Sequence, residues 1–249
     1  TWTTTHAKET ARAIKAGKHV LVEKPIASTV KEAKYMVKLA EDEKRILMTG
    51  FIERFNPGVE RVIKRLRGKA IGEIVSATAR RVSQWPERIG DVGVVKDYAI
   101  HDIDLMRHIF NEDPKTVFAK AGKLRHTRFE DYAQIMLTFS QGKTAFIETN
   151  WLTPYKVRKL ILTGSKGIMT LDYLTQEITI ETEKETFIPR FKWEEPLKRE
   201  LNHFIECVLK NKKPVVHGLD GLKALIICEA ALKSAVKGKS INIEKMLDM

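Results

Sequence analysis

The stretch AGKHVLVEKPIAS, residues 16–28, contains an apolar segment that ends in two opposite charges and a proline. The segment 19–22 is typical of a buried strand. Glu23 and Lys24 follow it, and Pro25, which has no N–H to donate, ends the strand there. We therefore expect a strand over 19–22 that places two charged side chains at its carboxyl end.

The segments around this strand alternate between helical and strand patterns. Residues 6–16 have apolar positions at helical spacing and are followed by Gly17, a residue favoured just past helix C-termini. Residues 29–43 repeat the helical spacing, and the apolar run 45–51 predicts a second strand. Helix, strand, helix, strand over 6–51 predicts a parallel sheet with crossover helices, an α/β unit.

The rest of the chain has a different pattern, which predicts an α+β unit that begins near residues 52–56. Residues 115–188 contain five or six strand-like segments separated by turn signals, and these predict one large, mainly antiparallel sheet. We expect one face of this sheet to be solvated and the other to pack on helices. The remaining expected elements are helices over 56–68, 97–110, 195–211 and 219–238 and a strand over 73–82.

Composition indicates a globular protein. The 249 residues are 43% hydrophobic, and no apolar run reaches the ~18 residues that a membrane-spanning helix needs. The first residues lack the layout of a secretory signal, and two cysteines give no disulfide framework, so we expect a cytoplasmic protein. Cys207 and Cys228 lie on apolar helical faces and are expected to be buried. Charged residues make up 31%, which suits a protein from a hot environment.

The formal net charge of +12 has three interpretations. A solvated surface is favoured, because lysines alternate with acids and apolar residues in patterns such as KEAKYMVKLAEDEK, residues 31–44. An anionic small-molecule partner, such as a phosphorylated ligand, is the second interpretation. A nucleic-acid partner is the third, since the sequence has neither zinc-ligand spacing nor an aromatic-basic platform motif.

Lys24 stands where a parallel sheet offers a ligand site. In open parallel sheets, ligands bind outside the carboxyl ends of the strands. A lysine at that edge can donate to a substrate oxygen or stabilise a developing alkoxide. The alternative is that Glu23 and Lys24 are a solvated pair with no role in chemistry.

A second candidate site lies in KDYAIHDIDLMRH. Asp97 and His101 are four residues apart, so a regular helix places them on one face, where the carboxylate can orient the imidazole as a proton acceptor. The alternative is a structural helix pair. A metal site is a further, less favoured reading, because Asp104 and His108 continue the same face but no second element supplies matching ligands.

Four other side chains are weaker candidates. Arg54 in GFIERFNPG lies just past the second predicted strand, where it would suit a phosphate or a sugar hydroxyl, although a plain surface arginine is equally consistent. His6 ends the loop expected for TWTTTH, and a capping or core role is favoured over ligand binding. Trp85 and Trp151 lie beside loops, where they can line a pocket or fill the core.

Four blocks of the sequence resemble the Gfo/Idh/MocA family of NAD(P)-dependent sugar and inositol dehydrogenases. In chain order they are TWTTTHAKETARAIKAGKHVLVEKPIA, GFIERFNP, GDVGVVKDYAIHDIDL and PLKRELNHFIECVLKNKKPVVHGLDGLKALIICEAALKSAVKGKSI. They keep the family's order and span nearly the whole chain. The resemblance implies the C-terminal part of a Rossmann domain over 1–52, followed over 53–249 by a substrate-binding and oligomerisation domain with a large, mainly antiparallel sheet and flanking helices.

The resemblance also implies roles for individual residues. Lys24 is implied to be the catalytic lysine, and Asp97 and His101 its acid–base pair. His101 would remove the proton of a sugar hydroxyl, Lys24 would stabilise the alkoxide, and Asp97 would hold His101 and favour its charged form. Contact with the cofactor, NAD or NADP, is implied for Thr3, His6, Glu23, Lys24 and Arg54. No residue is assigned to a metal.

The substrate implied by the resemblance is a nucleotide sugar. RRVSQWPERIGDVGVVKDYAIHDIDLM and GFIERFNP together are most similar to the branch that oxidises a ring hydroxyl of a UDP-N-acetylglucosamine-type sugar, and its diphosphate suits a basic chain. The large sheet offers a broad face to another copy, so we expect a homodimer or homotetramer.

The dinucleotide-binding turn of the family has no counterpart in the sequence. The Gly-x-Gly-x-x-Gly turn and the acidic residue that binds the ribose do not occur. We expect one of two explanations: the protein has about 70 further residues of the family's Rossmann domain before Thr1, or the chain is a true fragment. A noncatalytic ligand-binding or regulatory protein on the same scaffold is therefore the alternative function, and a nucleic-acid binder, suggested by charge alone, is the third.

Overall fold

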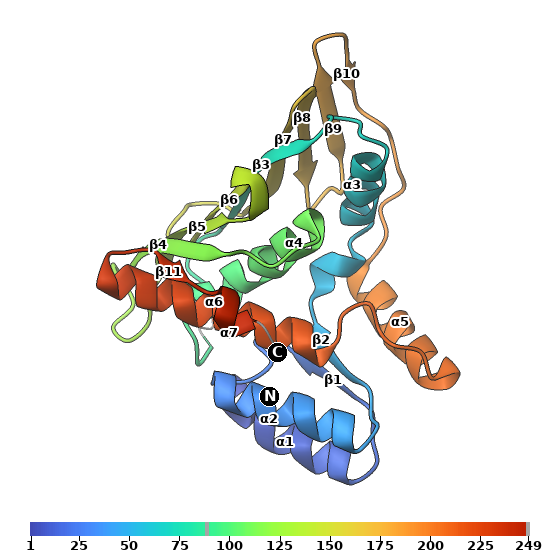
Figure 1. Ribbon diagram of the computed structural model, residues 1–249, viewed down its shortest axis with the longest axis vertical. Coiled ribbons are helices and arrows are strands. Elements are labelled where there is room, and N and C mark those ends of the chain that lie inside the picture. The colour runs from blue at the N-terminus through green and yellow to red at the C-terminus, as the bar shows by residue number, and fades with distance from the viewer. Residues whose placement is uncertain (88–89, 248–249) are drawn as a thin grey trace.

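The computed structural model describes residues 1–87 and 90–247, in which two sheets are present (Figure 1). The smaller sheet pairs β1 (Val20–Glu23) in parallel with β2 (Leu47–Gly50). Helices α1 (Thr3–Lys15) and α2 (Val30–Asp42) precede these two strands in turn and contact each other. The predicted alternation of helices with parallel strands is confirmed. Arg88 and Ile89, which belong to the stretch that suggested a UDP-sugar, lie outside the described residues, as do 248–249.

The larger sheet has nine strands in the order β10-β9-β8-β7-β3-β6-β5-β4-β11. Every neighbouring pair is antiparallel except β3 and β6, which are parallel at the centre. The prediction of one large, mainly antiparallel sheet is confirmed, and the central parallel pair is an addition to it. The strands are β3 (Ile74–Val82), β4 (Thr116–Gly122), β5 (Tyr132–Thr138), β6 (Thr144–Asn150), β7 (Val157–Gly164), β8 (Gly167–Asp172), β9 (Ile178–Thr182), β10 (Thr186–Phe187) and β11 (Ile241–Asn242).

Helices cover the inner face of this sheet. In Figure 1, α4 and α6 lie between the large sheet and the small α/β unit, and α5 lies to one side. α6 contacts β4 and α4 on one side and α2 and β2 on the other, so it joins the two parts of the chain. The helices and turns after β2 are η1 (Ile52–Phe55), α3 (Pro57–Arg67), a π-helical turn (Val95–Ala99), α4 (Ile100–Phe110), η3 (Ser140–Gly142), α5 (Pro196–Lys210), α6 (Gly218–Lys237) and α7 (Glu244–Leu247).

Local sequence explains where these elements begin. The Thr29 side chain accepts a hydrogen bond from the Glu32 N–H, and the Glu32 carboxylate accepts one from the Thr29 N–H, so a capping box starts α2. Asn56 caps α3 through the Gly58 N–H, and Pro57 occupies the first helical position. In β5, inward and outward residues alternate, which buries one face on the helices and exposes the other.

Two boundaries differ from the sequence-based expectation. Residues 3–5, expected as a loop, form the first turn of α1, because the Asp91 carboxylate accepts hydrogen bonds from the Thr3 and Thr4 N–H groups. Asp91, which lies 87 positions after Thr4, therefore caps the N-terminus of α1 in place of a neighbouring residue. The helix expected over 97–110 begins instead with the π-helical turn and becomes regular only at Ile100.

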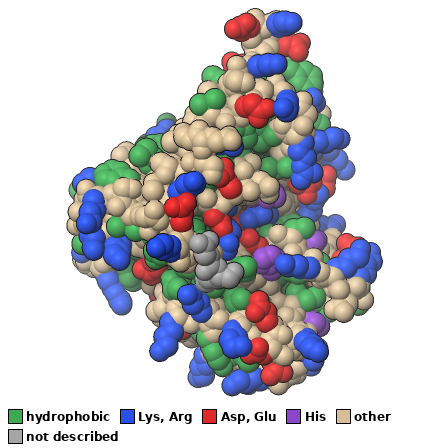
Figure 2. All heavy atoms as spheres, in the orientation of Figure 1, with side chains coloured by type: hydrophobic (Ala, Val, Ile, Leu, Met, Phe, Trp, Pro, Cys, Tyr) green, Lys and Arg blue, Asp and Glu red, His purple; other side chains and the backbone are tan. Residues whose placement is uncertain are grey.

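Surface charge is dispersed on the face that Figure 2 shows, where Lys and Arg side chains are interspersed with Asp and Glu. This arrangement supports the solvated-surface interpretation of the +12 net charge. Across the part of the chain that the structure describes, no helix combines the length and apolar character needed to cross a bilayer.

Gly221 permits the close approach of α6 to β2. A Cβ at this position would lie 2.4 Å from Thr49 Oγ1 and 3.0 Å from Ile26 Cβ. Both neighbours are fully buried and have no room to move. Gly221 therefore allows the short distance between α6 and β2.

We expect Gly221→Ala to destabilise the protein by about 1–3 kcal/mol, because overpacking outweighs the gain in helix propensity. Gly68→Ala is the matched control, since φ is −81° there and the nearest atom lies 3.5 Å from the new Cβ. Urea unfolding followed by circular dichroism measures both. Equal midpoints for the two variants would contradict the packing argument.

Candidate active site

Lys24 connects the carboxyl end of β1 to the second part of the chain. Its Nζ donates to Asp97 Oδ1 at 2.7 Å and to the Asp97 backbone oxygen at 2.8 Å. The two side chains remain partly accessible, with 17% and 34% of their surfaces exposed. The peptide bond between Lys24 and Pro25 is cis. Lys24 also lines a cavity, so its Nζ is held by two hydrogen bonds while the side chain remains partly accessible from that cavity.

Asp97 lies within the π-helical turn that precedes α4. Such turns are wider than an α-helix, occur mostly as single turns, and are frequent at functional sites. Here the turn presents both the carboxylate and the backbone carbonyl of Asp97 to Lys24. The expectation that Asp97 and His101 share a regular helical face is therefore wrong for this segment.

His101, the second residue of α4, is held without a hydrogen bond to its Nδ1. That atom is buried and has no partner among the described residues. The ring packs edge-on against Phe51, with ring centroids 6.2 Å apart. Burial holds the pKa of His101 well below its ordinary value of 6.5, and the positive charges of Lys24, Arg81 and Arg158 lower it further.

The electrostatics correct the role expected for Asp97. We expected this carboxylate to hold His101 and favour its charged form, but it is paired with Lys24, and the groups that act on His101 are cations. His101 is therefore a neutral imidazole at neutral pH. A neutral imidazole can accept a proton, which is the state that a general base requires.

Three of the residues expected to contact a cofactor lie with Lys24 around one cavity of about 420 Å³. Glu23 and Lys24 line it from the end of β1, and Thr3 and His6 line it from α1. The His6 Nδ1 forms a 2.9 Å hydrogen bond with the Pro25 carbonyl oxygen, which ties α1 to the Lys24 loop. His6 is thus a buried positioning residue on the cavity wall, in line with the capping or core role favoured from sequence.

Arg54 is the candidate that the structure does not bring to this cavity. Its Nε and Nη2 donate to the Asp104 carboxylate at 2.7 and 2.8 Å, and Asp220 lies 3.7 Å from Nη2. The side chain is almost fully buried, and its charge is neutralised by these two carboxylates. Arg54 therefore links η1 to α4 and α6, and the sequence pattern could not reveal these distant partners.

The geometry does not support the hypothesis of a metal site on α4. Asp104 accepts hydrogen bonds from Arg54, and burial together with the nearby Arg54 charge lowers the pKa of His108 to about 4. Within residues 1–87 and 90–247, no three His, Cys, Asp or Glu side chains are grouped as metal ligands would be.

A buried ion-pair network that the sequence patterns did not predict connects β3, α4 and η1. Arg81 on β3 donates to both oxygens of Asp102, at 2.6 and 3.1 Å, and lies 3.0 Å from Glu53. Tyr173 adds a longer contact of 3.4 Å to Asp102. The available signal was Arg81 itself, a charged residue at an inward position of an otherwise apolar strand face.

Asp91 and Glu200 were also missed. Burial alone would raise the pKa of Asp91, but hydrogen bonds from Thr4 and Thr3 outweigh it and lower that pKa. Glu200 on α5 is buried, with an unpartnered Oε1, and burial and the Glu23 charge raise its pKa to about 8. Neither role is visible in sequence, because each depends on residues far away in the chain.

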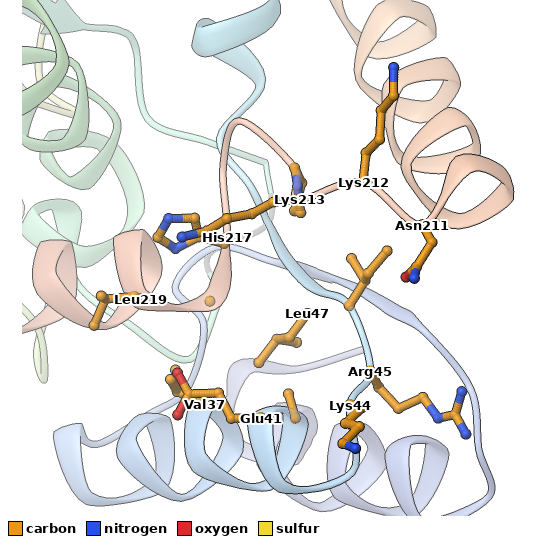
Figure 3. Close-up of a pocket in the computed structure, with 14 residues that line it drawn as sticks. Val37, Glu41, Lys44, Arg45, Leu47, Asn211, Lys212, Lys213, His217 and Leu219 are labelled. Carbon is orange, nitrogen blue, oxygen red and sulfur yellow. The ribbon is translucent and has the colours of Figure 1, made fainter.

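A second cavity of about 330 Å³ lies at the opposite end of β2, between α2 and the loop before α6 (Figure 3). Lys44, Arg45, Lys212 and Lys213 are among its lining residues. In Figure 3 the Lys212 side chain extends away from the cavity, and the Arg45 guanidinium points to the outside. Because these charges do not converge, this cavity is a weaker ligand site than the one beside Lys24.

Two family models match the chain. Residues 1–51 match the model described as oxidoreductase family, NAD-binding Rossmann fold. Residues 59–170 match the model described as GFO/IDH/MocA C-terminal domain. The first contains Lys24, and the second contains Asp97 and His101.

Most of the named relatives are dehydrogenases or oxidoreductases, and one, from Escherichia coli (strain K12), is 2,7-anhydro-N-acetylneuraminate hydratase. Inositol 2-dehydrogenase of Rhizobium meliloti (strain 1021) is 30% identical over 97% of this chain and 78% of its own length. UDP-N-acetylglucosamine 3-dehydrogenase of Acidithiobacillus ferrooxidans is 26% identical over 72% of this chain and 55% of its own length. The structure of an aldose-aldose oxidoreductase from Caulobacter crescentus, complexed with glycerol, superposes with a TM-score of 0.88 at 25% identity, over 96% of this chain and 76% of that one.

We expect His101 to titrate well below pH 6.5 in the native protein and to titrate at higher pH in Lys24→Met, because one repelling cation is removed. Below pH 6.5 the unfolded chain takes up a proton that native His101 refuses, so His101 makes stability fall as the pH falls. NMR of the histidine Cε1 protons measures the titration. Lys96→Met is the control, because the Lys96 ammonium is bound by Glu229 and Ser28. A native midpoint near 6.5 would contradict the account.

Proposed function

The chain belongs to the Gfo/Idh/MocA family of oxidoreductases, and on that premise we propose that it oxidises a ring hydroxyl of a sugar or nucleotide sugar by hydride transfer to NAD or NADP. The observation that supports this most is the bond from Lys24 to Asp97 beside the neutral His101. It combines a fixed ammonium donor with an uncharged proton acceptor, the two groups that alcohol oxidation needs.

His101 is the proposed general base. Its buried, unpartnered Nδ1 shows that no protein group already uses that side of the ring. The cations around it disfavour the protonated state, so the imidazole is neutral before the reaction. It takes the proton of the substrate hydroxyl as the hydride leaves the same carbon, and the hydroxyl becomes a carbonyl.

Lys24 stabilises the charge that develops on the substrate oxygen. Two hydrogen bonds to Asp97 fix its Nζ and leave a third N–H free to donate. Because the ammonium is already oriented, it need not reorganise as negative charge grows on the oxygen. Asp97 is therefore a positioning residue for Lys24 in this proposal.

The residues around the cavity fit the ribose side of a nicotinamide nucleotide. Glu23 supplies a carboxylate that can accept hydrogen bonds from ribose hydroxyls, and Thr3 and His6 line the same cavity. These three residues, with Lys24, would hold the cofactor. When bound, the nicotinamide ring supplies the hydride acceptor.

For the substrate we propose a UDP-N-acetylglucosamine-type sugar, ahead of a free sugar or an inositol. Support comes from the UDP-N-acetylglucosamine 3-dehydrogenase relative, which is 26% identical over 72% of this chain. The inositol 2-dehydrogenase relative supports the neutral cyclitol as the competing substrate.

We also propose that the protein is a homo-oligomer that associates through the outer face of the large sheet. Met136, Phe146 and Ile161 lie in one cross-strand row on that face and are 41%, 40% and 39% exposed. An apolar row on a broad flat surface suits an isologous contact with a second copy.

Replacing Lys24 with Met is expected to lower kcat/KM about 100- to 1000-fold, because the donor to the alkoxide is lost. The assay follows nicotinamide reduction with UDP-N-acetylglucosamine, myo-inositol and glucose, and we expect the nucleotide sugar to react fastest. Lys96→Met, in the same π-helical turn as Asp97, is the control and should retain activity. Unchanged turnover in Lys24→Met would contradict the assignment of Lys24 as the donor to the substrate oxygen.

The double variant Met136→Glu/Phe146→Glu should be monomeric where the native protein sediments as a dimer or tetramer, because two charges in each copy would be buried at the contact. Analytical ultracentrifugation at micromolar concentration distinguishes the states. Val236→Glu is the control, since Val236 is an exposed apolar residue on α6 and not on the sheet. A monomeric native protein would refute the proposed contact.

A further inference from the structure

Two arginines occupy directly opposed positions on the inner face of the large sheet. Arg81 on β3 pairs with Arg158 on β7 in the antiparallel register. Both are buried, at 5% and 6% exposure. Like charges that face each other across two strands repel, and burial strengthens that repulsion. Each guanidinium therefore needs a compensating negative charge.

Arg81 has that compensation within the protein. Asp102 accepts two hydrogen bonds from it, Glu53 lies 3.0 Å away, and the carboxylates raise the Arg81 pKa despite the opposing effect of burial. The pair of acids neutralises one arginine and fixes it between β3 and α4.

Arg158 has no such partner. Its Nη1 donates only to backbone carbonyls, those of Val82 at 3.2 Å and Val157 at 3.3 Å. The guanidinium carbon lies 4.3 Å from the centroid of the Tyr98 ring. No carboxylate within the described ranges forms an ion pair with Arg158. Burial followed by the Arg81 charge lowers its pKa, and a hydrogen bond to Tyr98 and the more distant Asp102 charge offset this only in part.

The surroundings of Arg158 belong to the candidate active site. Tyr98 directly follows Asp97, and Arg158 is close enough to His101 to lower its pKa. The Trp151 ring stands edge-on to Tyr98, with centroids 6.1 Å apart, and its Nε1 is a buried donor without a partner. Among the described residues, the Trp151 Nε1 donor and the His101 Nδ1 atom are thus both buried and without a hydrogen-bond partner in this region.

A buried guanidinium without a direct counter-ion is costly, and an anionic ligand would remove that cost by supplying the opposite charge. We propose that Arg158 binds an oxyanion of the substrate, a carboxylate or a phosphate, beside His101. The protein then selects anionic sugars over their neutral counterparts. This inference rests on the proposed function only for the role of His101 at the substrate, and it assigns Arg158 to substrate binding.

The test measures binding by calorimetry without nicotinamide or turnover. Two ligand pairs separate the sources of the oxyanion: UDP-N-acetylglucosamine with N-acetylglucosamine for phosphate, and glucuronate with glucose for carboxylate. We expect the native protein to bind the anionic member of at least one pair about tenfold more tightly or better. In Arg158→Met that preference should disappear while affinity for the neutral member is unchanged.

Two further variants exclude a merely structural role. Arg158→Met should melt at or above the native temperature, because an unpaired buried charge is removed, whereas Arg81→Met should melt lower, because Asp102 and Glu53 lose their partner. Arg158→Lys keeps the charge but loses the planar fork, so it should weaken anionic ligands alone even if Arg158→Met does not fold.

Three results would overturn the proposal: no charge preference in the native protein, equal weakening of neutral and anionic ligands in Arg158→Met, or native affinities in Arg158→Lys. A protein that prefers anionic sugars but reduces no nicotinamide would contradict the proposed function and leave this inference intact. A protein that reduces nicotinamide with neutral and anionic sugars equally would contradict this inference and leave the proposed oxidation of a sugar hydroxyl intact.

Discussion

The bond between Lys24 and Asp97 is the contact on which the candidate site depends. It joins two residues 73 positions apart and brings the end of β1 against the π-helical turn before α4. Other contacts maintain this approach: His6 holds the Pro25 carbonyl, Asp91 caps α1, and Gly221 lets α6 pack closely on β2. The fold therefore brings the Lys24 ammonium, from the first part of the chain, close enough to His101, from the second, to lower the pKa of that imidazole.

Positively charged side chains dominate the electrostatics of this site. Lys24, Arg81 and Arg158 all act on His101, and together with burial they keep the imidazole neutral. Asp97 and Asp102 form ion pairs with Lys24 and Arg81, whereas no described carboxylate forms a direct ion pair with Arg158. In the proposed reaction, these cations would stabilise the negative charge that develops on the substrate oxygen before it becomes a carbonyl, and they would favour an anionic substrate for the same reason.

Periodicity predicted the elements of this fold well because apolar spacing is a local signal. The α/β alternation, the helix over 29–43 and the large sheet all follow from it. The π-helical turn was not predicted, because the reasoning from Asp97 to His101 assumed regular helical spacing. The partners of Arg54 and Arg81 were not predicted either, since no local pattern encodes contacts between distant residues. Position and spacing singled out Lys24, Asp97 and His101, and family resemblance gave them catalytic roles, which stay predictions.

The central claim is that Lys24 and Asp97 act as one unit, in which the carboxylate orients the ammonium for the alkoxide. A double-mutant cycle on kcat/KM with Lys24→Met and Asp97→Asn tests this most directly. The account predicts that each single change is severe and that the double variant is scarcely worse than Lys24→Met, because Asp97 has nothing left to orient. Losses that multiply in the double variant would show that Asp97 acts independently of Lys24 and would contradict the account.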